Sequence, residues 1–119
     1  MFHVVDDNEH VRELIVELLD VAGYGGKAFS CPFEYLDYVN SDSYISPVAI
    51  ITDVRMPRMN GYELIEEVRE KFPNQKFVVI SGYEGKDGAV RTDPCHFLSK
   101  PFNPEQLIAV ADAIVRCDM

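Results

Sequence analysis

The chain has 119 residues, 47% of them hydrophobic, and a formal net charge of -9 at pH 7. This length predicts one domain, residues 1–119, and the hydrophobic fraction excludes an intrinsically disordered chain. The acidic balance argues against direct nucleic-acid binding by this domain, because a phosphate backbone requires a basic surface. The chain contains no apolar run long enough to span a membrane, and its three cysteines are widely spaced, so we expect a cytoplasmic location.

Short apolar runs alternate along the chain with segments in which apolar residues recur at helical spacing. In chain order we expect strand 2–5, helix 11–22, strand 27–29, helix 32–39, strand 48–52, helix 62–72, strand 77–80, a strand at 97–98 and a helix opened by the cap residue Asn103. Strands that alternate with helices predict an α/β fold, in which a doubly wound parallel sheet is covered by helices on both faces.

The apolar positions of the expected helices predict which of their side chains are buried. These positions are Val11, Leu14, Ile15, Leu18, Leu19, Ala22, Phe33, Leu36, Val39, Leu64, Ile65, Val68, Leu107, Ile108, Ala111, Ile114 and Val115. The segment 82–94, which would hold a fourth helix, has three glycines and offers only Ala89 and Val90 as apolar surface between Glu84 and Thr92. We therefore expect this fourth helix to be shortened or irregular, since each interior glycine costs about 1 kcal/mol relative to alanine.

Polar residues follow four of the five expected strands. Asp6 and Asp7 come after the first strand, Asp53 after the third and Ser81 after the fourth, and Lys100 comes soon after the fifth. In open parallel sheets, ligands bind outside the carboxyl ends of the strands. We therefore expect these five residues to meet at one edge of the sheet.

The residue types at this edge predict a cation and a phosphoryl group. Three converging carboxylates repel one another unless a cation joins them, and oxygen ligands without histidine or cysteine favour Mg²⁺. Lys100 could neutralise a phosphoryl oxygen and Ser81 could donate a hydrogen bond to another. An aspartate can take up a phosphoryl group as an acyl phosphate, so one of the three acids is expected to be the nucleophile.

The segments VVDDNE, ITDVRMPRMNGYEL, VVISG and FLSKPF resemble the receiver domain of two-component response regulators, over nearly the whole chain. The resemblance implies a flavodoxin-like five-stranded sheet in the order 2-1-3-4-5, which places the first and third strands side by side. It also implies a signalling switch and not an enzyme. A histidine kinase or phosphotransfer protein would donate the phosphoryl group, and the surface around the fourth helix, fifth strand and fifth helix would change, with a homodimer as one possible output.

The resemblance assigns roles to the acidic residues one by one. Asp53 would be the phosphoacceptor, and it would also contact the Mg²⁺ ion. Asp7 would bind Mg²⁺ directly, Asp6 mainly through water, and Arg55 through its backbone carbonyl, which leaves the Arg55 side chain free to vary.

The resemblance also assigns the remaining polar residues and one aromatic residue. Lys100 would pair with the phosphoryl group and would be followed by a cis peptide bond to Pro101. Ser81 would move toward the phosphoryl oxygens on phosphorylation, and the ring of Phe97 would turn into the space that Ser81 vacates.

Three other interpretations compete with this one. A Mg²⁺-dependent phosphatase or phosphotransferase of the haloacid dehalogenase type also uses a strand-end aspartate, but it usually has a second acid two residues later, where this chain has Arg55. A nucleotide-binding protein is disfavoured because GYGG follows a helix and no P-loop pattern is present. A degenerate receiver that serves only as a binding surface is disfavoured by the complete set of acids, hydroxyl and lysine.

Overall fold

A parallel sheet forms the centre of the computed structural model, which describes residues 1–56, 58–81, 96–99 and 102–117. Within these residues the sheet has five strands in the order β2-β1-β3-β4-β5. The strands are β1 (Phe2–Val5), β2 (Gly26–Phe29), β3 (Ile50–Asp53), β4 (Phe77–Ser81) and β5 (His96–Ser99). The α/β class and the strand order predicted from the sequence are confirmed. The third strand begins two residues later than the apolar run 48–52, and Asp53 is its last residue.

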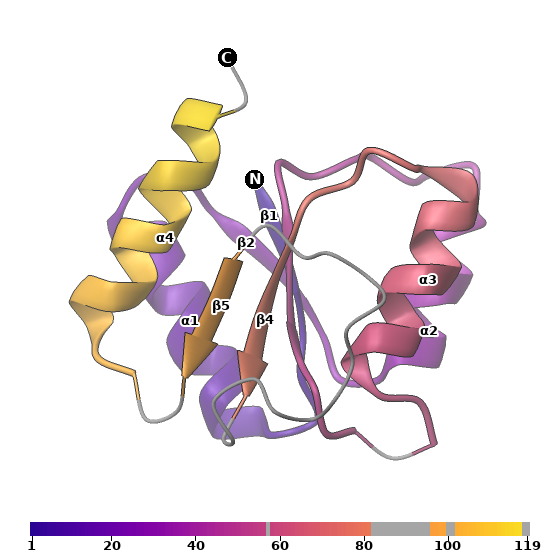
Figure 1. Ribbon diagram of the computed structural model, residues 1–119, viewed down its shortest axis with the longest axis horizontal. Helices are drawn as coiled ribbons and strands as arrows, with labels where there is room; N and C mark the ends of the chain where they lie inside the picture. The colour runs from indigo at the N-terminus through magenta and orange to yellow at the C-terminus, as the bar shows by residue number, and fades with distance from the viewer. Residues whose placement is uncertain (57, 82–95, 100–101, 118–119) are drawn as a thin grey trace.

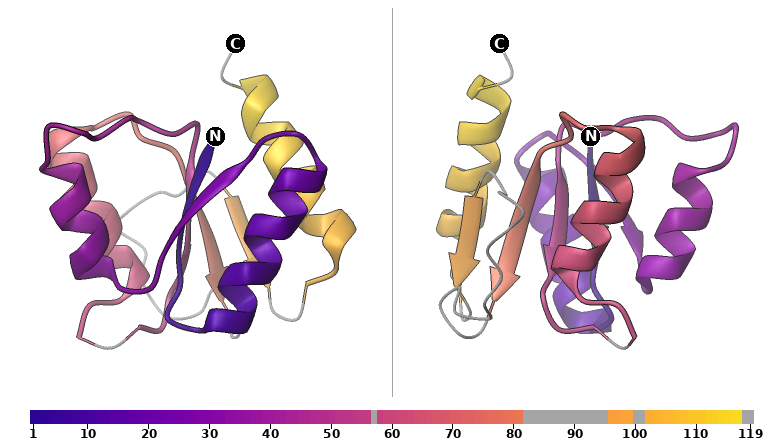
Figure 2. Two further views of the ribbon diagram at one scale, coloured as in Figure 1. Left: turned by 180° about the vertical axis from the view of Figure 1, so that it is seen from behind. Right: turned by 45° about the vertical axis from the view of Figure 1, so that its right-hand side comes forward.

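Four helices are described, and they cover the two faces of the sheet in pairs. They are α1 (Glu9–Val21), α2 (Pro32–Val39), α3 (Gly61–Lys71) and α4 (Pro104–Cys117). Helices α1 and α4 pack together on one face, and α2 and α3 on the other (Figure 1). The two views of Figure 2 show the same separation of the pairs. Helix α4 is the last helix expected from the sequence. The expected short or irregular fourth helix, in 82–94, lies outside the described residues.

Each face of the sheet buries its own hydrophobic cluster. Val5, Ile50 and Val79 lie in the cluster under α2 and α3, whereas Val4, Ile51 and Ile80 lie in the cluster under α1 and α4. Consecutive residues of one strand therefore enter opposite clusters, as the alternation of side chains along a strand requires. The central strands are buried on both faces, which explains why they are continuous apolar runs in the sequence.

Two residues that were expected to be buried in helices are exposed instead. Leu14 of α1 is 41% exposed and Phe33 of α2 is 39% exposed. In α2 the buried positions are Pro32, Tyr35 and Val39. Val39 is buried as expected, whereas Pro32 and Tyr35 are buried in place of Phe33 and the partly buried Leu36. The expectation for Phe33 was wrong because an eight-residue helix with apolar residues on several sides does not define its inward face.

The buried side chain of Tyr35 is paired with His3 of β1. His3 is 2% exposed, and a hydrogen bond of 2.8 Å joins its Nδ1 atom to the Tyr35 hydroxyl. Burial, reinforced by the positive charges of Lys27 and the N-terminal amino group, lowers the pKa of His3 to about 4. His3 is thus a strand residue of the core.

The helix boundaries follow recognisable signals in the sequence. Gly23 has a φ of +91° just after α1, which is a conformation that glycine adopts without steric cost. Before α4, the Asn103 side chain accepts a hydrogen bond from the Gln106 backbone, and the Gln106 side chain accepts one from the Asn103 backbone. The predicted cap at Asn103 is therefore confirmed. None of the described helices combines the length and the apolar character that a bilayer crossing would need.

Candidate functional site

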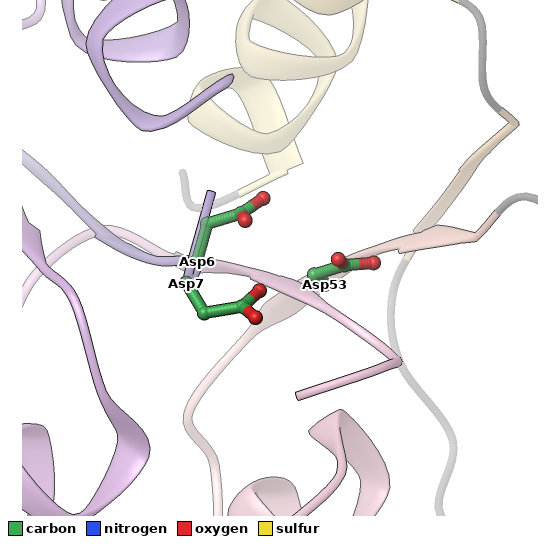
Figure 3. A group of neighbouring side chains, drawn as sticks. All are labelled: Asp6, Asp7 and Asp53. Atoms are coloured by element: carbon green, nitrogen blue, oxygen red, sulfur yellow. The ribbon is translucent and has the colours of Figure 1, made fainter. Parts of the chain in front are cut away.

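Three carboxylates converge at the carboxyl end of the central strands. Asp6 and Asp7 follow β1, Asp53 ends β3, and β1 pairs directly with β3. One carboxylate oxygen of each residue lies within 4.8 Å of one oxygen of both others. Figure 3 shows the side chains of Asp6 and Asp7 beside that of Asp53. The predicted meeting of these three acids is confirmed, and it follows from the order of the strands.

One backbone group and one side chain at the start of α1 fix the position of Asp6. Its Oδ1 atom accepts a hydrogen bond of 2.8 Å from the Asn8 backbone N–H. Its carbonyl oxygen accepts one of 2.9 Å from Nη1 of Arg12. The Asn8 side chain in turn caps α1 by accepting a hydrogen bond from Val11. Asp6 is 1% exposed, so this carboxylate is held inside the site and has little freedom to turn toward solvent.

Asp53 is held by the strand and by the helix that follows it. Its Oδ1 atom accepts a hydrogen bond of 2.8 Å from the Val54 backbone N–H, and its carbonyl accepts one of 3.0 Å from the Thr52 hydroxyl. Gly61, the first residue of α3, lies against that carbonyl: a β-carbon at position 61 would be 2.4 Å from the oxygen. The close approach requires glycine at this position, and it fixes the end of the loop that leads from β3 into α3.

The donor set fits a hard divalent cation. All three groups are carboxylates, which suit Mg²⁺, Ca²⁺ or Mn²⁺ better than the metals that prefer nitrogen or sulfur ligands. Asp6 and Asp53 are buried, whereas Asp7 is exposed, so the site is open on the Asp7 side. Mg²⁺ usually keeps several water molecules and uses one or two protein carboxylates, which an open site of this kind allows.

The other predicted site residues are only partly placed. Ser81 ends β4 and pairs with Ser99 of β5, while Asp53 pairs with Ile80, the residue before Ser81. Phe97 pairs with Val79. The backbones of Ser81 and Phe97 therefore lie in the strands where they were expected, and their side-chain roles stay predictions. Lys100 and Pro101, with the predicted cis peptide bond between them, lie outside the described residues.

Two features near the site were not predicted from the sequence. The cap at Asn8 had a detectable signal, because asparagine directly before a helical pattern is a favoured cap. The position of Arg58 had no such signal: its φ is +69° and its guanidinium carbon lies 5.3 Å from the centre of the Phe33 ring. This contact depends on two segments far apart in the sequence.

Residues 2–112 match the family described as the response regulator receiver domain, and the chain belongs to this family. It is a phosphorylation-dependent switch of two-component signalling. The finding supports the receiver interpretation, and nothing in the comparisons favours a haloacid dehalogenase-type enzyme.

Similar proteins have the same architecture or are longer regulators. Over 93% of its own length, this chain is 31% identical to the transcriptional regulatory protein FixJ of Azorhizobium caulinodans. Over 94% of its own length, it is 25% identical to the DNA-binding transcriptional regulator NtrC of Klebsiella pneumoniae. The high-resolution structure of the chemotaxis response regulator CheY4 of Vibrio cholerae is similar, with a TM-score of 0.84 and 26% identity, and the match covers 95% of this chain and 96% of that one. The chain spans 53% of that FixJ and 24% of that NtrC.

Proposed function

We propose that Asp53 is the phosphoacceptor of this receiver domain and that Mg²⁺ binds beside it. The observation that carries the proposal is the convergence of Asp6, Asp7 and Asp53 within 4.8 Å. Asp6 has a backbone N–H on one oxygen and is almost fully buried, whereas Asp7 is exposed. Asp53 ends the central strand of the sheet and lies between the other two acids and β4, where a phosphoryl group could also reach Ser81.

The proposed reaction moves one phosphoryl group. A carboxylate oxygen of Asp53 attacks the phosphorus of a phosphohistidine, the P–N bond breaks, and its electron pair returns to the imidazole, which takes up a proton. An acyl phosphate remains on Asp53. Bound Mg²⁺ would neutralise charge on the phosphoryl oxygens, held by Asp6, Asp7, Asp53 and the backbone carbonyl of Arg55. Little more than positioning and charge neutralisation is required of the protein.

Two further polar residues complete the proposed site. The Lys100 ammonium pairs with a phosphoryl oxygen, and the Ser81 hydroxyl donates a hydrogen bond to another. Ser81 is the last residue of β4 and Lys100 comes directly after β5, and these places in the sequence support the two roles. Ser81 and the ring of Phe97 then act as the switch, and the surface around the expected fourth helix, β5 and α4 changes. Fluorine labelling of Phe97 tests this: an unchanged ring signal on addition of beryllofluoride would contradict the switch.

The proposed partners follow from the family. The phosphoryl donor is a histidine kinase or a phosphotransfer protein in the cytoplasm, and a homodimer formed on phosphorylation is one form of the output. The domain is a phosphoacceptor and turns over no separate substrate. Its net charge of -9 supports the view that this domain does not itself contact DNA, although a relative such as NtrC is named as a DNA-binding regulator.

Intact-mass measurement with acetyl phosphate tests the proposed acceptor. The wild type should gain one phosphoryl group in the presence of Mg²⁺ and none in EDTA. Asp53→Asn should gain none in either condition. Asp42→Asn, which changes an exposed aspartate outside the site, is the matched control and should behave as the wild type. Equal phosphoryl uptake by the wild type and Asp53→Asn would contradict the assignment.

A further inference from the structure

We propose that Arg58 and Phe33 form a clasp that positions the loop after Asp53 and thereby sets the affinity of the site for Mg²⁺. The guanidinium carbon of Arg58 lies 5.3 Å from the centre of the Phe33 ring, within the range of a cation–π contact. Phe33 is the second residue of α2, and Arg58 lies in the loop between β3 and α3. The inference rests on the proposed metal site, to which the Arg55 carbonyl of the same loop contributes.

Arg58 has an unusual backbone conformation, which the contact with Phe33 can explain. Arg58 is the one non-glycine residue with a positive φ among those the structure describes. A side chain at φ +69° is sterically disfavoured, so this conformation persists only where the surroundings hold it. Phe33, which is 39% exposed, is not required there by the hydrophobic core. The contact with Arg58 gives both the exposed ring and the unusual backbone a common explanation.

The two ends of the loop between β3 and α3, which contains Arg58, lie against each other. The Gly61 backbone N–H donates a hydrogen bond of 2.9 Å to the Val54 carbonyl, and Gly61 lies against the Asp53 carbonyl. Met56 is 8% exposed, with its sulfur 4.0 Å from the Thr52 hydroxyl. Both ends of the loop are thus fixed next to the phosphoacceptor. Arg58 adds an anchor in the second half of the loop.

This arrangement links the clasp to the metal site. Arg55 lies between the anchor at Met56 and the end of β3, and its carbonyl can serve as a ligand only if the loop keeps one conformation. Helix α2 begins three residues after the carboxyl end of β2, which is the same edge of the sheet as the acids. Phe33 can therefore hold Arg58 from a rigid element. Loss of the ring should let the loop relax from the strained backbone at Arg58, and Mg²⁺ should bind more weakly.

Calorimetric titration with Mg²⁺ tests the clasp. Phe33→Ala should weaken Mg²⁺ binding about two- to fivefold, the factor that corresponds to one exposed cation–π contact. Phe33→Tyr keeps the ring and should bind as the wild type does. Ile45→Ala, which also truncates an exposed apolar side chain but lies away from the loop, is the matched control and should have no effect. Wild-type affinity in Phe33→Ala would overturn the proposal.

A double-mutant cycle separates the clasp from a general packing effect. Arg58→Gly removes the contact but also permits a positive φ, so it should weaken binding less than Phe33→Ala does. In the Arg58→Gly background, Phe33→Ala should have no further effect, because the partner of the ring is already absent. An equal effect of Phe33→Ala in both backgrounds would show that the ring acts without Arg58.

Limited proteolysis gives a readout that does not depend on the metal. Trypsin should cut the Arg58–Met59 bond faster in Phe33→Ala than in the wild type or Phe33→Tyr, with cleavage after Lys71 as the internal reference. If the wild type binds no Mg²⁺, the proposed metal site is wrong. The rate of trypsin cleavage after Arg58 then remains as the test of the contact between Arg58 and Phe33. Unchanged cleavage at Arg58 in Phe33→Ala would then overturn the clasp as well.

Discussion

The carbonyl oxygen of Asp53 and the α-carbon of Gly61 approach so closely that no other residue fits at position 61 without a shift. The β-carbon of an alanine there would be 2.4 Å from that oxygen. The oxygen belongs to the backbone of β3, so it cannot move aside as the end of a flexible side chain could. A displacement of the first turn of α3 would therefore also displace the backbone of Asp53, the proposed phosphoacceptor.

Gly61→Ala should reduce stability and phosphoryl uptake together. Overpacking of this kind typically costs about 1–3 kcal/mol, and the displaced backbone carries Asp53. Urea unfolding and intact-mass analysis with acetyl phosphate measure the two effects. Gly23→Ala is the matched control: Gly23 has a φ of +91° but nothing within 4 Å of the added β-carbon. It should lose stability and still take up phosphoryl groups at the wild-type rate. Phosphoryl uptake by Gly61→Ala at the wild-type rate would contradict the claim that a shift at position 61 displaces Asp53.

Removal of one acid should weaken Mg²⁺ binding without loss of the fold. Asp7 is exposed, so Asp7→Asn removes a proposed ligand and leaves the packing intact. Since loss even of groups that only support metal ligands costs about 10–100-fold in affinity, we expect at least about tenfold weaker binding by calorimetry. Asp37→Asn makes the same change in net charge at an exposed position of α2. If both variants lose affinity equally, the effect is one of net charge and Asp7 is not a ligand.

Stability should fall as the pH decreases from about 6.5 to about 4 because of His3. Its pKa is lowered to about 4 in the folded protein, so the unfolded chain binds the proton first, and folding is penalised increasingly across this interval. The contribution is on the order of 3 kcal/mol at the acid end. His3→Gln, compared with the wild type by urea unfolding at each pH, should lack this part of the slope. Parallel slopes would show that His3 does not titrate in this range.

Tyr35→Phe should destabilise the domain more than Tyr44→Phe does. The Tyr35 hydroxyl hydrogen bonds His3 at 2.8 Å in the core, whereas the Tyr44 hydroxyl lies 3.3 Å from that of Tyr35 and is only partly buried. Removal of the Tyr35 hydroxyl leaves a buried polar nitrogen of His3 without this bond, which costs about 1–3 kcal/mol. Urea unfolding at pH 7 provides the comparison. A larger loss for Tyr44→Phe would mean that the bond between His3 and Tyr35 contributes little.

The sequence alone was sufficient to predict that the acids meet at one edge of a parallel sheet, and the reason is physical. Asp6, Asp7 and Asp53 each follow an apolar run, and the carboxyl ends of parallel strands must lie at one edge. The order of the strands was implied by the resemblance to receiver domains. The inward faces of short helices were less predictable. Phe33 has the right chemistry for the core and is exposed, because apolar spacing in the eight-residue α2 fixes the orientation of the helix only within about one residue. Leu14 of the longer α1 is also exposed, because several apolar residues of α1 compete for its inward face.

Side-chain contacts between distant segments that no sequence motif marks were not predicted. His3 and Tyr35 are 32 residues apart in the sequence, and neither residue type signals the other. The positive φ of Arg58 likewise has no local cause, since arginine is not a residue that favours this conformation. Such features become visible only when packing brings the partners together.

The hydrogen bond from the Asn8 backbone to Asp6 has a consequence for how tightly the site holds a cation. It marks the amino end of α1, where the helix macrodipole presents partial positive charge. That field stabilises the Asp6 carboxylate but opposes a divalent ion next to it, so affinity in the resting domain should be modest. An acyl phosphate on Asp53 would add negative charge and reverse this balance. Phosphorylation of Asp53 would then increase the affinity for Mg²⁺ by some factor. By thermodynamic linkage, bound Mg²⁺ would shift the equilibrium toward the phosphorylated form by the same factor.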